Sequence, residues 1–295
     1  MKTSSHQTKK EFWVYVRKAI LWLIILVILA TLADIARFAA TVAVIPTIGK
    51  TGIAYDNPFS QTVVSARERI LVIGDSTAVG IGAYIPKETI AGMLATDFPD
   101  ADIINKAISG SRIADVRFQL DATEGDFDMI FMQAGANDVV FMTEPEDVER
   151  ELSALMDSAL IRSSRVVVVS SIDASILPLL PKIASLFLAE RSAKIFPDIE
   201  RVVTTKGGFF VDLYQSKEEE AFAENADTLF SADGFHPSSD GYRLAYARIR
   251  NDLITVGEVI EEDGRLYFVS KVSGVSGEET REKEHPTVNE TSFEM

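Results

Sequence analysis

The residues best suited to chemistry in this chain are one serine, one histidine and one aspartate. His236 is the only one of the three histidines that lies outside the polar terminal segments, and it ends the sequence DGFH, which begins with Asp233. Ser76 ends the sequence LVIGDS, in which a short apolar run is followed by a sharp polar turn. A serine hydroxyl needs a base, and that base needs a group that holds its orientation. These three residues can fill the three roles.

Two further motifs offer hydrogen-bond donors to the oxyanion that develops on an attacked carbonyl. Gly110 follows the run 103–109 and precedes a helix-like stretch, where a backbone N–H can approach a ligand without hindrance from a side chain. Asn137 belongs to the sequence GAND, which follows the strand-like run 129–133. Its side-chain amide is therefore expected at the same edge of the sheet as Ser76.

With these motifs in this order, residues 68–256 resemble the SGNH (GDSL-type) hydrolases, whose hallmarks are Ser in GDS, a Gly, Asn in GxND and His in DxxH. The resemblance implies that Ser76 is the nucleophile, His236 the general base and then acid, and Asp233 the orienting carboxylate. It also implies an oxyanion hole formed by the backbone N–H groups of Ser76 and Gly110 and the side chain of Asn137. The sequence GDSTA lacks the leucine that often follows this serine, which concerns the substrate rather than the mechanism.

Each motif taken alone has an ordinary structural explanation. Gly-Asp-Ser forms turns, Asn-Asp can cap a helix, and Asp-Gly is a common loop sequence. The conjunction of four motifs in one order, three of them after strand-like runs, is what indicates a catalytic site.

Other functional signatures are incomplete. The sequence GIG at 80–82 begins a dinucleotide-binding pattern, but Ile85 stands where the third glycine belongs. No G-x-S-x-G motif is present, which argues against the α/β-hydrolase family. With no cysteine and one usable histidine, neither a metal site nor another cofactor is expected. The chain has many acidic residues, but its sequence does not distinguish the paired catalytic carboxylates of a glycosidase from an acidic surface in contact with water.

Strand-like apolar runs alternate with helix-like segments in the middle of the chain. The runs lie at 69–74, 101–106, 128–134, 165–171 and 208–213. This alternation predicts an α/β fold, a three-layer α/β/α sandwich with a five-stranded parallel sheet, and the resemblance implies the flavodoxin-like arrangement of SGNH hydrolases. Ligands of such sheets bind at the carboxyl ends of the strands. One helix is expected at 146–160, with a capping box from Thr143 and Glu146, and a final helix at about 238–255.

The sequence predicts one catalytic domain with additions at both ends. Residues 1–50 are expected to form a cytoplasmic N-terminus and a membrane anchor helix, 51–68 a linker, and 69–256 the hydrolase domain. Residues 257–270 form a possible hairpin around the sequence EEDG. Residues 271–295 have almost no large apolar residue and are expected to be disordered.

The N-terminal segment suggests attachment to a membrane. The run Ala19–Ala33 is 15 residues long and uncharged, which is shorter than the roughly 20 residues of a spanning helix, but the apolar character resumes after Arg37 and continues to Ile45. A cleaved signal peptide is the main alternative, although no clean cleavage site follows, and a buried helix is a third. The basic residues before the run include Lys9, Lys10, Arg17 and Lys18. We therefore expect a single-pass anchor in the cytoplasmic membrane, with the catalytic domain outside the cytoplasm.

The charge distribution excludes nucleic acid as an expected partner. The first 18 residues carry five basic and one acidic residue, whereas the remainder carries 24 basic and 43 acidic residues. A domain this acidic is repelled by phosphate backbones. The expected partners are an ester substrate and, through the N-terminal helix, the membrane.

These observations predict a membrane-anchored serine esterase that uses no metal or organic cofactor. Lysophospholipids or other lipid esters are the favoured substrates, followed by acetylated envelope glycans. The apolar segments Val139–Met142 and Ile176–Leu188 could line an acyl pocket or simply belong to the core. An acyltransferase with the same triad and a non-catalytic binding module stay open.

Overall fold

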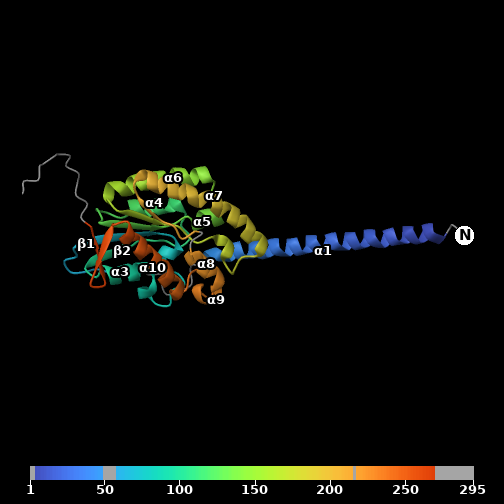
Figure 1. Ribbon diagram of the computed structural model, residues 1–295. Coiled ribbons are helices and arrows are strands. Elements are labelled where there is room, and N and C mark those ends of the chain that lie inside the picture. The colour runs from blue at the N-terminus through green and yellow to red at the C-terminus, as the bar shows by residue number, and fades with distance from the viewer. Residues whose placement is uncertain (1–3, 49–57, 215–216, 270–295) are drawn as a thin grey trace, which may run out of the picture.

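A single parallel sheet organises the protein, and the computed structural model describes residues 4–48, 58–214 and 217–269 (Figure 1). The sheet has five strands in the order β2-β1-β3-β4-β5. The strands are β1 (Glu68–Gly74), β2 (Ala101–Asn105), β3 (Met129–Gln133), β4 (Val166–Val169) and β5 (Phe209–Val211). The predicted α/β class and five-stranded parallel sheet are confirmed.

Helices cover both faces of this sheet and complete the three-layer sandwich (Figure 1). One face is covered by α4 (Ile113–Asp121), α5 (Ala136–Val140), α6 (Pro145–Arg162) and α7 (Lys182–Lys206). The other face is covered by α2 (Ser76–Val79), α3 (Ile90–Asp97) and α10 (Ser239–Thr255). Alternate residues of β1 serve the two cores, with Leu71 and Ile73 on the α6 side and Ile70 and Val72 on the α10 side. Because both faces of the sheet are buried, the sequences of the central strands are continuous apolar runs.

The start of α6 differs from the sequence-based expectation. Its N-cap is Glu144, the helix begins at Pro145, and the cap side chain accepts no helix N–H. A proline has no N–H to satisfy at the first helical position and forces the preceding residue into an extended conformation. The predicted capping box of Thr143 and Glu146 is therefore wrong.

Two segments outside the predicted domain core pack against it. Residues 58–67, assigned by the sequence to a linker, lie along the outer edge of β2, where the Gln61 N–H and the Ile103 N–H each donate to the other residue's carbonyl at 2.9 Å. This pairing covers an otherwise open sheet edge. The strands β6 (Val259–Glu262) and β7 (Arg265–Phe268) form an antiparallel hairpin whose turn residues, Asp263 and Gly264, have φ values of 51° and 75°. The predicted tail 271–295 lies outside the described residues.

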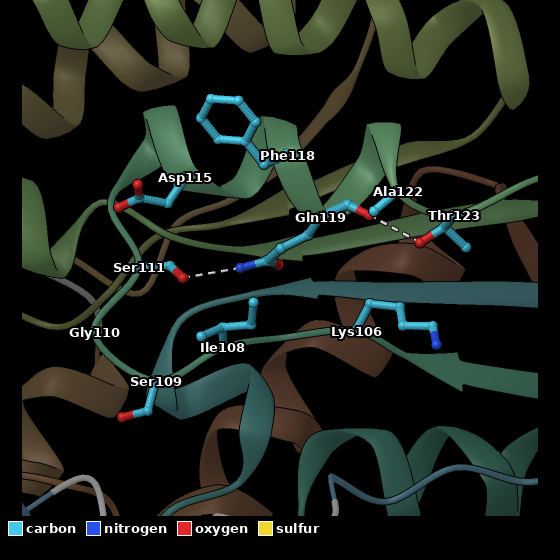
Figure 2. A pocket seen from close by; sticks show the side chains of 10 residues that line it. All are labelled: Lys106, Ile108, Ser109, Gly110, Ser111, Asp115, Phe118, Gln119, Ala122 and Thr123. Atoms are coloured by element: carbon cyan, nitrogen blue, oxygen red, sulfur yellow. Dashed lines mark hydrogen bonds between the residues drawn. The ribbon is translucent and has the colours of Figure 1, made fainter.

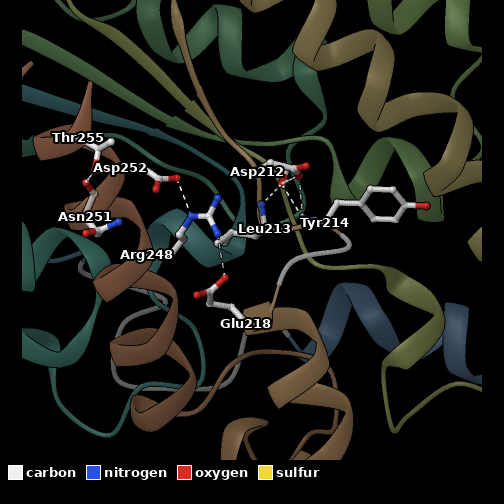
Figure 3. Close-up of polar contacts among 9 residues, drawn as sticks. Asp212, Leu213, Tyr214, Glu218, Arg248, Asn251, Asp252 and Thr255 are labelled. Atoms are coloured by element: carbon white, nitrogen blue, oxygen red, sulfur yellow. Dashed lines mark hydrogen bonds and ion pairs between the residues drawn. The ribbon is translucent and has the colours of Figure 1, made fainter. Parts of the chain in front are cut away.

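A polar contact holds α8 (Lys217–Glu224) against α10 (Figure 3). The Arg248 guanidinium of α10 donates to Asp252 at 2.7 Å and to Glu218 of α8 at 3.4 Å. Asp212, which follows β5, accepts a hydrogen bond from the Tyr214 N–H at 2.9 Å. The short helix α9 (Ala226–Leu229) then leads into the loop 230–238. The Ser231 N–H donates to the His236 carbonyl and the Ser238 N–H to the Leu229 carbonyl, both at 2.8 Å, so the segment that carries Asp233 and His236 is tied to itself and to the end of α9.

The N-terminal helix α1 (Ser4–Ile48) extends away from the rest of the protein (Figure 1). Within it, Phe12–Arg37 is 26 residues long with a mean hydropathy of 2.7, and none of the most apolar stretch is buried in the protein. At 1.5 Å per residue this segment is about 39 Å long, more than the roughly 30 Å hydrocarbon core of a bilayer. It is long and apolar enough to cross a membrane. A signal sequence near the N-terminus can have the same length and composition.

We expect Gly74→Ala to destabilise the protein more than Gly207→Ala. Both glycines have a positive φ, +143° and +89°, which disfavours any L-residue. An added Cβ at Gly74 would also lie 2.0 Å from the Gln133 carbonyl oxygen, whereas a Cβ at Gly207 would meet nothing within 4 Å. Urea denaturation of the full-length protein in detergent should show a loss of roughly 3 kcal/mol for Gly74→Ala and about 1 kcal/mol for Gly207→Ala. Equal losses would contradict this account of the end of β1.

Candidate active site

The motifs found in the sequence lie together at the carboxyl edge of the sheet. Ser76 begins α2 directly after β1, Gly110 lies in the loop between β2 and α4, and Asn137 lies in α5 after β3. Asp233 and His236 come from the loop before α10. Because parallel strands end at one edge, loops far apart in sequence converge there.

His236 lies between Ser76 and Asp233. Its Nε2 is 2.9 Å from Ser76 Oγ, and its Nδ1 is 2.8 Å from Asp233 Oδ2. When Nδ1–H donates to the carboxylate, Nε2 keeps a lone pair that can accept the serine hydroxyl. Ser76 is 6% exposed and His236 is 2% exposed, so water competes little for these bonds. This geometry permits proton transfer from Ser76 to His236.

The Asp233 carboxylate is held in its ionised form. Burial alone would raise its pKa, but the hydrogen bond and charge of His236 and the backbone N–H groups of Phe235 and His236 lower the pKa well below its usual range. The two N–H groups donate to Asp233 Oδ1 at 2.8 and 2.9 Å, which leaves Oδ2 for the imidazole. A carboxylate so fixed orients the imidazole ring and favours its Nδ1–H tautomer.

Asp75 fixes the turn that presents Ser76. Its Oδ1 accepts the Thr77 N–H at 2.9 Å and the Thr77 hydroxyl at 2.6 Å, so Asp75 caps α2. Its own N–H donates to the Gln133 carbonyl at 3.0 Å, which ties the turn to β3. Burial raises the pKa of Asp75, against the opposing effect of the Thr77 donors. The residue before the serine therefore has a structural role.

Close backbone contact brings the histidine loop onto the serine loop. A Cβ on Gly82 would lie 2.3 Å from the Pro237 carbonyl oxygen and 3.1 Å from His236 Cβ. The buried Tyr242 hydroxyl donates to the Ile81 carbonyl at 2.7 Å and ties α10 to the same loop. Only a glycine at position 82 permits this approach without displacing His236.

The loop 108–111 lies between the end of β1 and α5. Gly110 has φ +84° at the third position of a turn closed by the Ser111 N–H, which donates to the Ile108 carbonyl at 3.2 Å. The Ile108 N–H donates to the Gly74 carbonyl at 3.1 Å, and Asn137 Nδ2 donates to the Ser111 carbonyl at 2.9 Å. Since an amide nitrogen carries two hydrogens, Asn137 retains one donor beyond this bond.

A small cavity of about 40 Å³ lies against Ser76 and His236. Asn137 lines it, as do Val140 and Leu177, which belong to the two apolar segments singled out in the sequence. Gly110 lines a neighbouring groove instead (Figure 2). Within the described residues, no group of three or more His, Asp or Glu side chains is placed to hold a metal ion.

A family model described as GDSL-like Lipase/Acylhydrolase matches residues 72–244, from β1 into α10. The chain belongs to this family. The match includes all four motifs, and it establishes an esterase or lipase family without specifying the substrate. No curated protein matches the chain.

Solved structures are similar to this GDSL-family chain at low sequence identity. The crystal structure of TesA is 18% identical, with a TM-score of 0.52 over 64% of this chain and 99% of that chain. An extracellular lipase from Streptomyces rimosus is also 18% identical, with a TM-score of 0.49 over 62% and 98% of the two chains. At this identity the likeness to TesA shows a shared fold and no more.

Sequence reasoning missed Gln119, a buried residue of α4 that joins three parts of the GDSL-family site (Figure 2). Its Oε1 accepts the Gly74 N–H at 2.8 Å, and its Nε2 donates to the Gly74 carbonyl and to Ser111 Oγ, both at 2.9 Å. The strand β2 ends at Asn105, opposite Val72, so Gly74 has no partner on the β2 side of the sheet. The Gln119 side-chain amide takes the place of that missing strand neighbour. Only its place among apolar core residues could have marked it in the sequence.

Asp138 is a second buried group that sequence analysis did not assign. Its Oδ2 accepts the Ile113 N–H at 3.0 Å, so it caps the first turn of α4 from a neighbouring element. Burial raises the pKa of Asp138 to about 6, although the Ile113 N–H and nearby Arg112 oppose the shift. The second residue of the Asn-Asp pair therefore supports α4, while the first lines the cavity.

We expect Gln119→Leu to lower kcat by roughly 10-fold or more and to change KM little. The substitution leaves the Gly74 N–H and the Ser111 hydroxyl without this partner and loosens the loops around Ser76, and small displacements of reacting groups lower kcat strongly. Ester hydrolysis by the full-length protein, measured over a range of substrate concentrations, separates the two constants.

Thr123→Val is the matched control, because its buried hydroxyl donates to the Gln119 carbonyl at 2.8 Å and not to Gly74 or Ser111. It should lower thermal stability by a similar amount and leave kcat within about twofold. If kcat fell in both variants in proportion to their loss of stability, Gln119 would have no positioning role of its own.

Proposed function

We propose that this protein is a membrane-anchored serine ester hydrolase in which Ser76, His236 and Asp233 form the catalytic triad. The proposal rests on one observation, the continuous hydrogen bonding from Asp233 through His236 to Ser76 at 2.8 and 2.9 Å. Membership of the GDSL-like family supports ester hydrolysis as the reaction.

In the proposed acylation step, Ser76 Oγ attacks the carbonyl carbon of the ester and its proton moves to His236 Nε2. The ionised Asp233 stabilises the imidazolium that forms. His236 then gives the proton to the alcohol oxygen as the bond between that oxygen and the carbonyl carbon breaks. The alcohol leaves, and the acyl group stays on Ser76.

Deacylation repeats this chemistry with water. A water molecule attacks the acyl carbon while His236 Nε2 takes its proton, and His236 returns that proton to Ser76 Oγ as the carboxylic acid departs. Both steps place negative charge on the former carbonyl oxygen. In our proposal this charge is bound by the N–H groups of Ser76 and Gly110 and by Asn137 Nδ2, which the bond to Ser111 holds in place.

Lipid esters are the proposed substrates, with lysophospholipids first and acetylated envelope glycans next. The support is the apolar segment Phe12–Arg37, because an enzyme held at a bilayer meets lipid esters at high local concentration. The apolar residues Val140, Leu177 and Phe235 beside Ser76 also favour a hydrocarbon over a sugar at the carbonyl.

Two variants test the triad. Ser76→Ala should abolish ester hydrolysis and labelling by a fluorophosphonate probe, because no oxygen nucleophile remains. Asp233→Asn should lower kcat by roughly 10⁴-fold, because an amide at this position favours the wrong imidazole tautomer. Hydrolysis of p-nitrophenyl acetate and peptide mapping of the probe measure both effects.

Ser158→Ala is the control for these variants, since its hydroxyl bonds only the Ala154 carbonyl of its own helix, at 3.1 Å. It should retain full hydrolysis and full labelling. Probe attached to a serine other than Ser76, or hydrolysis that survives Ser76→Ala, would refute the assignment.

The proposed orientation places the N-terminus in the cytoplasm and the catalytic domain outside it. The chain has no cysteine, so one introduced thiol reports one position. Thr255→Cys, at the exposed end of α10, should react in intact cells with a thiol reagent that cannot cross the cytoplasmic membrane. Ser5→Cys should react only after lysis. The reverse pattern would invert the orientation, and a shorter protein released from the membrane would identify a cleaved signal sequence.

A further inference from the structure

The start of α7 exposes two large apolar side chains to water. Leu186 is 76% exposed and Phe187 is 51% exposed, although the same helix buries Leu188 and Ile195 in the core. Leu186 also borders a hollow of about 370 Å³ together with Ser175 of the preceding segment. Exposed apolar side chains that lie together mark a surface that binds another apolar body. No step of the proposed catalytic mechanism uses this surface.

This surface lies at the same edge of the sheet as the proposed triad. The helix α7 follows β4, so it begins at the carboxyl edge. The segment between β4 and α7 lines the triad cavity with Ala174 and Leu177. Within that segment, the Leu179 N–H donates to the Gly234 carbonyl at 3.0 Å, which ties it to the loop that carries His236. A body bound to the start of α7 is therefore held at the edge where the triad lies.

The proposed membrane helix leaves the protein at this edge too. The helix α1 packs beside α7, and Figure 1 shows it leaving on the side where α8 and the start of α7 lie, while the orange-red hairpin β6–β7 lies at the opposite end. From Arg37, where the apolar segment ends, to Ile48, α1 is about 17 Å long. The headgroup layer of a bilayer is roughly 5–8 Å thick on each side. A bilayer around the segment Phe12–Arg37 therefore has its surface close to the start of α7.

The charges at the start of α7 suit a layer of lipid headgroups. Its first turn contains no acidic residue, and Lys182, one turn before Leu186, is exposed. The acidic helix α8 also lies at this edge, but Glu218 bonds an arginine of α10 at 3.4 Å and Glu219 accepts the Asp173 N–H at 2.7 Å. Lysine beside exposed apolar side chains is the pattern of helices that lie in a membrane interface.

We propose that the start of α7 binds the surface of the bilayer that α1 crosses, with Leu186 and Phe187 inserted among the lipids and Lys182 beside their phosphates. The inference rests on the proposed membrane anchoring and adds a second contact, made by the catalytic domain itself. An anchor of one helix leaves the domain free to turn about the helix axis. The second contact fixes the carboxyl edge of the sheet against the bilayer, so the triad cavity lies on the lipid side of the domain.

The first test locates the two side chains. Because the chain has no cysteine, Leu186→Cys and Phe187→Cys in the full-length protein each accept one environment-sensitive fluorophore. The nanodiscs contain phosphatidylcholine and phosphatidylglycerol, with a nitroxide on the lipid acyl chains near the headgroup. Both labels should be quenched by the nitroxide lipids and shielded from iodide in the water.

Ile161→Cys is the matched control, because Ile161 is 84% exposed and lies at the end of α6 before β4, at the opposite edge of the sheet. Its label should be quenched by iodide and not by the nitroxide lipids. Iodide quenching of all three labels alike would overturn the proposal. Labels at positions 186 and 187 that are shielded from iodide but not quenched by the lipids would also overturn it, in favour of a protein partner such as a second copy of the chain.

The second test asks whether the contact serves catalysis. The double variant Leu186→Ser/Phe187→Ser should lower kcat/KM for a lysophospholipid held in the nanodisc by roughly fivefold or more, because interfacial binding scales with buried apolar area. It should leave kcat/KM for p-nitrophenyl acetate within about twofold, because that ester reaches Ser76 from water. Ile161→Ser should change neither value. An equal loss for both esters, or no loss for the lipid, would overturn the proposal.

The two tests separate this inference from the proposed function. Labels quenched by the lipids in a protein that hydrolyses neither ester would refute the proposed function and support the membrane contact. Hydrolysis of both esters by a protein whose labels stay in water would overturn the membrane contact and leave the proposed function intact.

Discussion

The backbone of Gly74 is the point on which the site depends. Its N–H and carbonyl both bond the Gln119 side chain, and its carbonyl also accepts the Ile108 N–H. The next residue, Asp75, donates its N–H to Gln133 of β3. These four bonds fix the position from which Ser76 leaves the sheet and the distance from it to the loop 108–111. A peptide unit buried at the end of a strand must find such partners, because it has no water to bind.

Three carboxylates near the site have different pKa values because their surroundings differ. Asp233 accepts bonds from an imidazole and two N–H groups, which lower its pKa. Asp75 and Asp138 are more deeply buried, at 2% and 1% exposed, and burial raises their pKa values more than their hydrogen-bond donors lower them. The first group can stabilise a positive charge on His236. The other two cap helices, and their ionisation in the folded protein opposes stability above their raised pKa values.

The helix α1 and the residues at the strand ends contribute to different parts of the same proposed reaction. The helix would hold the protein at a bilayer, where lipid esters are concentrated. It does not act on the carbonyl itself. In this view the chemistry is carried by a few hydrogen bonds at the strand ends, from Asp233 through His236 to Ser76.

The sequence by itself determined the fold class and the strands, because buried strands are continuous apolar runs and their boundaries are local. It also named Ser76, Asn137, Asp233 and His236, which tertiary structure brings to one edge, while their roles stay a prediction. Gln119 could not be found, because its function arises only where β2 ends at Asn105 and leaves Gly74 without a neighbour on the β2 side. The capping box at Thr143 failed because Pro145 sets the start of α6. The groove was also decided by tertiary structure, since a cavity depends on how α4 and the loop 106–111 pack together, and neither segment encodes that distance on its own.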